Sequence, residues 1–140
     1  VALALTGPMA ARPRRMRSGL RILVAEDNPV NSLLVTRLLE RQGHAVTAVR
    51  NGREAVERFT AEPFDAVLMD LVMPEMDGYA ATRAIRAHEQ GSGRRTPIIA
   101  VTAESLDRVQ SACAAAGLDA CVAKPLEPAA VVEALMSLVG

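Results

Sequence analysis

Residues 64–78 read FDAVLMDLVMPEMDG, and this stretch decides the fold. An apolar run of strand length ends at Asp70, and a loop that contains Pro74 and Gly78 follows it. The pattern predicts a buried parallel strand with a functional group at its carboxyl end, where open α/β sheets bind their ligands. We interpret Asp70 as a nucleophile that accepts a phosphoryl group.

Three other apolar segments also end in polar side chains. If these segments are parallel neighbours of the Asp70 strand, two further acids, one hydroxyl and one amine converge with Asp70 on one edge of a sheet. The side chains are Glu26 and Asp27 after residues 21–25, Thr102 after residues 98–101, and Lys124 after residues 120–123.

The whole chain alternates between strand and helix patterns. Asn28 and Pro29 predict a helix start, because Asn is a preferred N-cap and Pro is favoured at the first helical position. Short connections and right-handed crossovers then predict an α/β fold, a doubly wound five-stranded parallel sheet of order 2-1-3-4-5. This order places Glu26 and Asp27 beside Asp70. The expected strands are 21–25, 45–49, 64–70, 98–101 and 119–123, and the expected helices are 29–43, 53–61, 78–89, 104–116 and 127–138.

The composition fits one globular domain with a short tail. Half of the 140 residues are hydrophobic, which excludes a disordered chain, and only 2% are aromatic, so aliphatic residues must build the core. Lys plus Arg and Asp plus Glu number 16 each, which gives no global sign of a nucleic-acid or membrane partner. Residues 1–20 hold four arginines and no acid. We expect residues 1–19 to be a linker or disordered tail and residues 20–140 to be the domain.

Cysteine usage and hydropathy indicate a cytoplasmic setting. Cys113 and Cys121 lack a metal-binding or CxxC spacing and are expected to be reduced thiols. No apolar run reaches the roughly 20 residues that a membrane span needs, and the arginines follow the apolar start, which is the wrong order for a signal peptide. We expect a monomer or weak dimer without nucleic-acid or membrane contacts, although a parent chain could be membrane-anchored.

Three carboxylates at one edge of a sheet would repel one another, and a divalent cation would relieve the repulsion. Oxygen ligands without His or Cys favour Mg²⁺, which keeps several of its waters. We expect Asp27 and Asp70 to bind Mg²⁺ directly and Glu26 to bind it through water. A backbone carbonyl, that of Val72, is expected to complete the protein ligands.

Lys124 and Thr102 are expected to stabilise the transferred group. Phosphoryl transfer requires alignment and positive charge on the equatorial oxygens more than covalent help from the protein. Lys124 would supply charge and Thr102 a hydroxyl, while ionised Asp70 attacks phosphorus. Taken alone, a strand-ending Asp is more often a cap or turn residue, and Lys124 a surface residue; the spacing of the whole set favours the functional interpretation.

Together these stretches resemble the receiver domains of two-component phosphorelay signalling. The resemblance implies the 2-1-3-4-5 sheet, Mg²⁺ dependence, a phosphohistidine donor on a histidine kinase or phosphotransfer protein, and a cis bond between Lys124 and Pro125. The opening EDNPVN at 26–31 resembles receivers attached to hybrid sensor histidine kinases, so the parent chain is expected to be such a kinase and this domain its phosphoacceptor. The matching stretches are ILVAEDN at 22–28, LMDLVMPEMDG at 68–78, VTA at 101–103 and KPL at 124–126.

One position departs from the family pattern. Receivers usually carry Tyr or Phe where this chain has Cys121, and that ring moves inward when the Thr turns toward the phosphoryl group. A thiol is smaller, so we expect a muted conformational switch; the alternative is that Cys121 simply packs. The other residues expected to flank the switch or the phosphoryl group are Val72, Ala103, Glu104 and Pro125.

Three alternative functions differ from this one in either the context of the domain or the chemistry of the acidic edge. A stand-alone response regulator would use the same residues in another context. A hydrolase of the haloacid dehalogenase kind is disfavoured, because that chemistry requires a second acid two residues after the nucleophile, where this chain has Val72. A pseudo-receiver that only binds proteins is disfavoured by the intact acids, Thr102 and Lys124.

Overall fold

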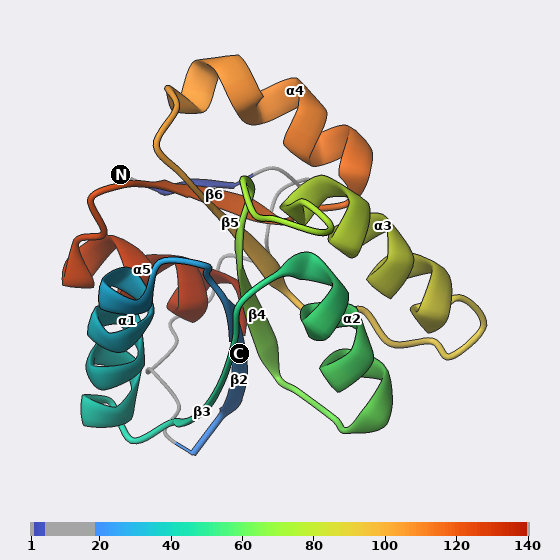
Figure 1. The fold of residues 1–140 in the computed structure, drawn as a ribbon, viewed down its shortest axis with the longest axis horizontal. Coiled ribbons are helices and arrows are strands. Elements are labelled where there is room, and N and C mark those ends of the chain that lie inside the picture. The colour runs from blue at the N-terminus through green and yellow to red at the C-terminus, as the bar shows by residue number, and fades with distance from the viewer. Residues whose placement is uncertain (1, 5–18, 140) are drawn as a thin grey trace.

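The computed structural model describes residues 2–4 and 19–139 and contains one six-stranded sheet between two layers of helices (Figure 1). Five of the strands are parallel and lie in the spatial order β3-β2-β4-β5-β6. Counted along the chain, this order is 2-1-3-4-5, so the predicted doubly wound sheet is confirmed. The five strands are β2 (Arg21–Ala25), β3 (Ala45–Val49), β4 (Ala66–Asp70), β5 (Ile98–Thr102) and β6 (Ala120–Ala123).

The sixth strand, β1 (Ala2–Ala4), was not expected from the sequence. It pairs with the outer edge of β6 in the antiparallel direction. The sequence predicts a linker or disordered tail over these residues, because three residues are too few to show a strand pattern. The rest of that predicted tail, residues 5–18, lies outside the described residues.

The helix ends follow from local sequence. The side chain of Asn28 accepts hydrogen bonds from the backbone N–H groups of Val30 and Asn31, and Pro29 occupies the first turn, as predicted. Gly117 ends α4 with a φ of 99°, a left-handed conformation that glycine adopts without strain. The helices are α1 (Pro29–Arg41), α2 (Gly52–Ala61), α3 (Gly78–Glu89), α4 (Leu106–Ala116) and α5 (Pro128–Leu138).

The predicted start of the fourth helix at residue 104 is wrong by two residues. The backbone N–H of Glu104 donates to Thr102 Oγ1 at 3.0 Å, and this turn keeps residues 103–105 out of the helix. Helix α4 therefore begins at Leu106, and Glu104 belongs to the loop that follows β5.

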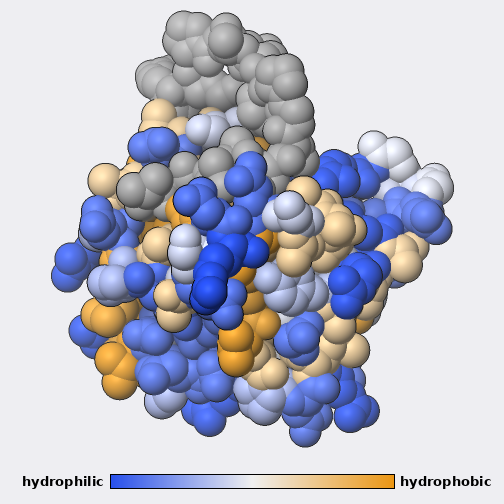
Figure 2. Space-filling view, turned by 90° about the horizontal axis from the view of Figure 1, so that it is seen from above, coloured by the Kyte–Doolittle hydropathy of each residue, from blue (hydrophilic) through white to orange (hydrophobic). Residues whose placement is uncertain are grey.

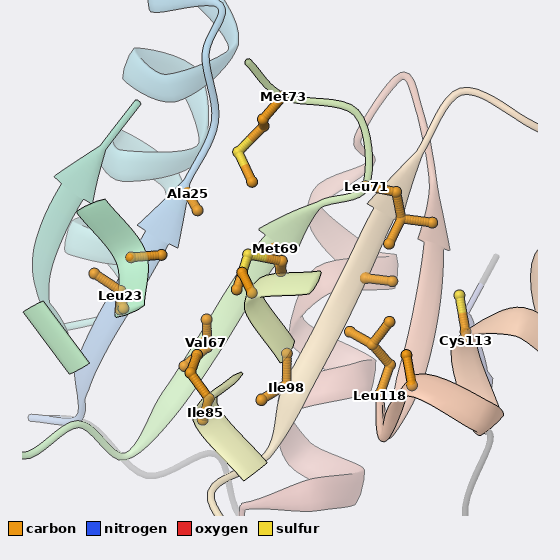
Figure 3. Close-up of a cluster of buried hydrophobic side chains, with 14 of the residues drawn as sticks. Leu23, Ala25, Val67, Met69, Leu71, Met73, Ile85, Ile98, Cys113 and Leu118 are labelled. Carbon is orange, nitrogen blue, oxygen red and sulfur yellow. The ribbon is translucent and has the colours of Figure 1, made fainter. Parts of the chain in front are cut away.

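Two hydrophobic cores lie on the two faces of the sheet. Helices α2, α3 and α4 cover one face and α1 and α5 cover the other (Figure 1). Figure 3 shows the first core, in which Val67 and Ile98 project from neighbouring strands toward Ile85 of α3. All five residues of β4 are buried, as expected for a central parallel strand that is covered on both faces. The strand that carries Asp70 is thus held rigidly on both sides.

The surface mixes polar and apolar residues. On the face seen in Figure 2, hydrophobic residues form small groups among hydrophilic ones. Among the described residues, no helix has the length and apolar character that crossing a membrane requires.

Candidate functional site

The acidic residues meet where the sheet changes winding direction. Strands β2 and β4 are neighbours, so the ends of both strands place Glu26, Asp27 and Asp70 together. One carboxylate oxygen from each of the three residues lies within 4.8 Å of the other two. Glu26 and Asp70 are each only 4% exposed, whereas Asp27 is exposed. The convergence predicted from the sequence is therefore present.

Backbone hydrogen bonds fix the two buried carboxylates. The N–H of Asn28 donates to Glu26 Oε2 at 3.1 Å, and the N–H of Val72 donates to Asp70 Oδ1 at 3.2 Å. The loop after Asp70 folds back so closely that Gly78 lies against the backbone of Asp70 and Leu71, where a Cβ atom would collide. Its N–H donates to Leu71 O at 3.1 Å. A glycine at this position thus lets the loop close over the end of β4.

Lys124 reaches the acids from the end of β6. Its Nζ lies 2.8 Å from Asp70 Oδ2 and 3.1 Å from Glu26 Oε1. Burial works to lower the pKa of Lys124, but the hydrogen bonds and charges of Asp70 and Glu26 outweigh burial and raise this pKa. Lys124 is therefore a fixed ammonium that bridges both buried carboxylates.

The charge at the site is unbalanced in favour of the acids. Burial raises the pKa of Glu26, and the neighbouring Asp70 raises it further, while the N–H of Asn28 and the ammonium of Lys124 lower it. Lys124 pairs with Glu26 and Asp70, and Asp27 adds a third carboxylate, so the acids of this set outnumber its ammonium. All three donors are oxygen atoms, the donor set that Mg²⁺ prefers, and ligands on one such ion lie at most about 4.2 Å apart. The cluster fits a divalent cation with small side-chain movements. If one carboxylate binds the ion through water, its oxygen can lie farther from the other two.

Thr102 lies at the end of β5, one strand from Asp70. It is 2% exposed, and β5 is joined to the site loop by the N–H of Leu71, which donates to Val101 O at 3.1 Å. Ala103 and Glu104 follow Thr102 and are exposed. The structure thus places a hydroxyl next to the acidic edge, and its oxygen accepts the N–H of Glu104.

The remaining predicted site residues surround this centre. Val72 follows Asp70 by two residues, and its side chain is 74% exposed. Pro125 is exposed, and the bond between Lys124 and Pro125 is cis, as the resemblance implied.

Cys121 lies inside the core rather than at the surface. It is fully buried beside Cys113, and burial raises the pKa of both thiols, so both stay protonated. Burial also raises the pKa of Tyr79 to about 12, as does its proximity to Cys113. Tyr79 is partly buried and packs against the same core.

Helix α1 carries an exposed apolar surface that its sequence pattern does not reveal. Val30 and Leu34 recur at helical spacing, but they are 64% and 62% exposed, and Val35 and Leu39 face the core instead. Leu33 is also half exposed. A groove of about 680 Å³ runs beside this surface. Its lining includes Leu34 and Leu38 of α1, Ala103, and the segment that contains Lys124, Pro125 and Leu126.

The model of the response regulator receiver domain matches residues 22–136. This chain belongs to that family. The receiver is 38% identical over 138 residues to the sensor histidine kinase GacS of Pseudomonas protegens, and the match covers 91% of the receiver and 15% of GacS. The receiver spans 13–19% of the length of the curated relatives it matches first.

Solved receivers of histidine kinases share the fold. The receiver of the sensor histidine kinase PA1611 from Pseudomonas aeruginosa, with a magnesium ion coordinated in its active site cleft, is 42% identical with a TM-score of 0.79; the match covers 88% of this chain and 99% of that one. The receiver of the histidine kinase CKI1 from Arabidopsis thaliana, complexed with Mg²⁺ and BeF₃⁻, is 35% identical with a TM-score of 0.75 and coverages of 84% and 90%. The predicted resemblance to receivers of histidine kinases is confirmed.

Proposed function

We propose that Asp70 accepts a phosphoryl group from a phosphohistidine on a histidine kinase or phosphotransfer protein. The observation that carries the proposal is the position of Asp70, which ends a rigid central strand between Glu26, Asp27 and the ammonium of Lys124. In the reaction, an Asp70 carboxylate oxygen forms a bond to phosphorus, and the bond between phosphorus and the histidine nitrogen of the donor breaks. The histidine nitrogen leaves with the electron pair of that bond.

Asp27 and Asp70 are proposed as the direct ligands of Mg²⁺, with Glu26 acting through water and the Val72 carbonyl completing the protein ligands. The support is the closely spaced set of oxygen donors, which matches the preference of this ion, and the magnesium in the PA1611 receiver. When bound, Mg²⁺ offsets negative charge on the transferred group.

Lys124 and Thr102 have complementary roles in this proposal. Lys124 loses its contact with Asp70 Oδ2 as that carboxylate becomes an acyl phosphate, and it then pairs with a phosphoryl oxygen. Thr102 has a hydroxyl proton that can be donated to another phosphoryl oxygen, while its oxygen still accepts from Glu104. Because each residue lies at or just after a strand end, little rearrangement is required. The exposed Val72 and Glu104 would then control how water reaches the acyl phosphate.

The apolar surface of α1 is proposed as the docking site for the protein that carries the phosphohistidine. Leu34 lines the groove, and Lys124, which contacts Asp70, lines the same groove. A donor helix with apolar residues on one face would cover Leu33 and Leu34 while its histidine approaches Asp70. Lys124 thus connects the groove with the acceptor.

Incubation with Mg²⁺ and acetyl phosphate, followed by intact-protein mass spectrometry, tests the acceptor. A single phosphoryl adduct is expected, and it should be absent in Asp70→Asn. An adduct of equal yield in Asp70→Asn would refute the assignment. Omission of Mg²⁺, with EDTA present, should strongly reduce the yield.

A second experiment tests docking separately from chemistry. Leu34→Asp is expected to slow transfer from a phosphorylated histidine phosphotransfer protein about tenfold, the effect of losing one central apolar contact, and to leave acetyl phosphate labelling unchanged. Gln110→Asp, an exposed change on α4, is the matched control and should alter neither rate. Equal slowing with both donors would place Leu34 in the chemistry or in the fold rather than in docking.

The wider context is also a proposal. The relatives support a receiver within a hybrid sensor histidine kinase, and sequencing the flanking gene would show whether kinase segments are attached. We propose a cytoplasmic domain that acts as a monomer or weak dimer without nucleic-acid or membrane contacts. Light scattering of the purified domain would test the oligomeric state.

A further inference from the structure

The outer edge of β6 carries a strand that the five-stranded parallel sheet does not require. An edge strand exposes backbone N–H and C=O groups that a further strand can pair with. Strand β1 pairs with this edge, and Figure 1 shows it lying along β6. In the register of the two strands, Leu3 lies opposite Cys121, Ala2 opposite Val122 and Ala4 opposite Ala120. The edge is therefore a strand-binding surface with a defined register.

The directions of the backbone N–H groups of β6 follow from Lys124, the residue directly after the strand. The N–H of Lys124 donates to Thr102 O at 2.7 Å, which is on the β5 side. Since successive residues of a strand direct their N–H groups to opposite sides, the N–H of Val122 should face β5 and that of Cys121 should face β1. In the antiparallel register, Leu3 then exchanges hydrogen bonds with Cys121.

The same strand connects the edge with the acidic site. Lys124 follows β6 directly, and its ammonium contacts both Asp70 and Glu26. Cys121 precedes Lys124 by three residues, so the backbone paired with Leu3 is continuous with the backbone that positions the ammonium. Lys124 and the residue opposite Leu3 therefore belong to one short stretch of chain, which links the acidic site to the outer edge of β6.

We propose that the outer edge of β6 is a docking site for the chain's own segment Ala2–Ala4, and that docking is coupled to modification of Asp70 through Lys124. The segment and the edge belong to one chain, so pairing between them does not require a second molecule, and this favours the segment over a second copy. The docking does not depend on the proposed function; the coupling rests on it.

Amide hydrogen exchange in the full chain, followed by NMR, tests the docking. Leu3→Pro removes the N–H that should face β6, whereas Ala2→Pro alters the first residue of the strand, where proline is tolerated, and is the matched control. Leu3→Pro should speed exchange of the Cys121 amide about tenfold, the effect of losing the net free energy of roughly one hydrogen bond, and leave the Val122 amide unchanged. Deletion of residues 1–4 should reproduce this pattern.

Several results would overturn the docking. Equal exchange of Cys121 in the wild type, Leu3→Pro and the deletion would show that the segment does not protect the edge. Protection in the wild type that rises with protein concentration would assign the edge to a second copy. Slower folding or loss of the folded state is not expected, because β1 lies outside the five-stranded sheet, and the unchanged Val122 amide monitors this.

Beryllofluoride with Mg²⁺ tests the coupling. Loading the wild type should change Cys121 exchange, and Leu3→Pro should change the apparent affinity for beryllofluoride by the same factor, since coupling between two binding events is reciprocal. Beryllofluoride that binds without either change would overturn the coupling. If instead beryllofluoride fails to bind and acetyl phosphate gives no adduct, the proposed function fails, while the exchange pattern of Leu3→Pro still decides the docking.

Discussion

Replacing Arg86 should destabilise the domain more than any surface charge change. Its guanidinium lies at the end of the sheet opposite Asp70 and is only 14% exposed. It donates to Asp119 Oδ2 at 2.7 Å, to Glu89 Oε1 at 2.7 Å, and to the carbonyls of Thr96 and Gly117 at 2.8 and 3.0 Å. Both carboxylates are more than nine-tenths buried. Removal of Arg86 would leave one buried acid without a countercharge and two carbonyls without this donor.

The size of the destabilisation depends on the partners that Asp119 keeps when Arg86 is removed. Breaking a buried ion pair from one side costs about 3–5 kcal/mol, and Asp119 keeps Arg95, with Nη2 at 2.8 Å, and the N–H of Ile98. We therefore expect the lower end, about 3 kcal/mol of unfolding free energy for Arg86→Ala, which lowers the Tm of a domain of this size by about 10 °C. Urea unfolding and thermal melts followed by circular dichroism would measure both quantities.

The controls for this prediction use the same network. Arg95→Ala removes a side chain that is 53% exposed and should cost less than about 1 kcal/mol, because exposed pairs contribute little. Arg86→Lys should recover only part of the loss, since a single ammonium cannot make the forked contacts. If Arg86→Ala and Arg95→Ala destabilise the domain equally, the network does not carry the stability assigned to it.

Three further predictions concern the site and pH. Gly78→Ala should displace the backbone at Asp70 and reduce both stability and acetyl phosphate labelling, measured by melts and intact mass; labelling at the wild-type rate would contradict the crowding. Lys124→Met should tighten Mg²⁺ binding severalfold in isothermal titration while slowing phosphorylation, because the ammonium competes with the cation for Asp70 and Glu26; weaker Mg²⁺ binding would contradict this. Burial lowers the pKa of His44 below its unfolded value near 6.5. The contribution of neutral His44 to the free energy of unfolding is therefore complete above about pH 6.5 and is lost as the pH falls through the folded pKa. Between about pH 7.5 and pH 5.5, urea unfolding should show a smaller loss of stability in His44→Gln than in the wild type.

The acidic site could be predicted because each functional side chain directly follows a short apolar run. A buried parallel strand reads as continuous hydrophobic sequence, so its carboxyl end is visible as the first polar residue. The order of the strands then brings Glu26, Asp27 and Asp70 together, and the structure has them within 4.8 Å. Lys124 was found in the same way.

The rest depends on tertiary contacts that leave little trace in local patterns. In the sequence, Arg86 and Glu89 look like surface charges of a helix, and Asp119 like a charge at the start of a strand, yet they pair inside the protein. On α1, apolar residues lie on two faces, so periodicity could not decide whether Leu34 or Val35 is buried. Strand β1 pairs with the outer edge of β6, and the position of that edge follows from the order of the strands rather than from residues 2–4.

The exposed side chains of Val30, Leu33 and Leu34 have a consequence for work with concentrated samples. Apolar surface of this kind is prone to stick to a second molecule when no partner is present. Self-associated receivers would then cover one another's α1, and phosphoryl transfer from a protein donor would slow as the sample is concentrated. A small reagent such as acetyl phosphate would still reach Asp70. Dilution should restore the protein-dependent rate.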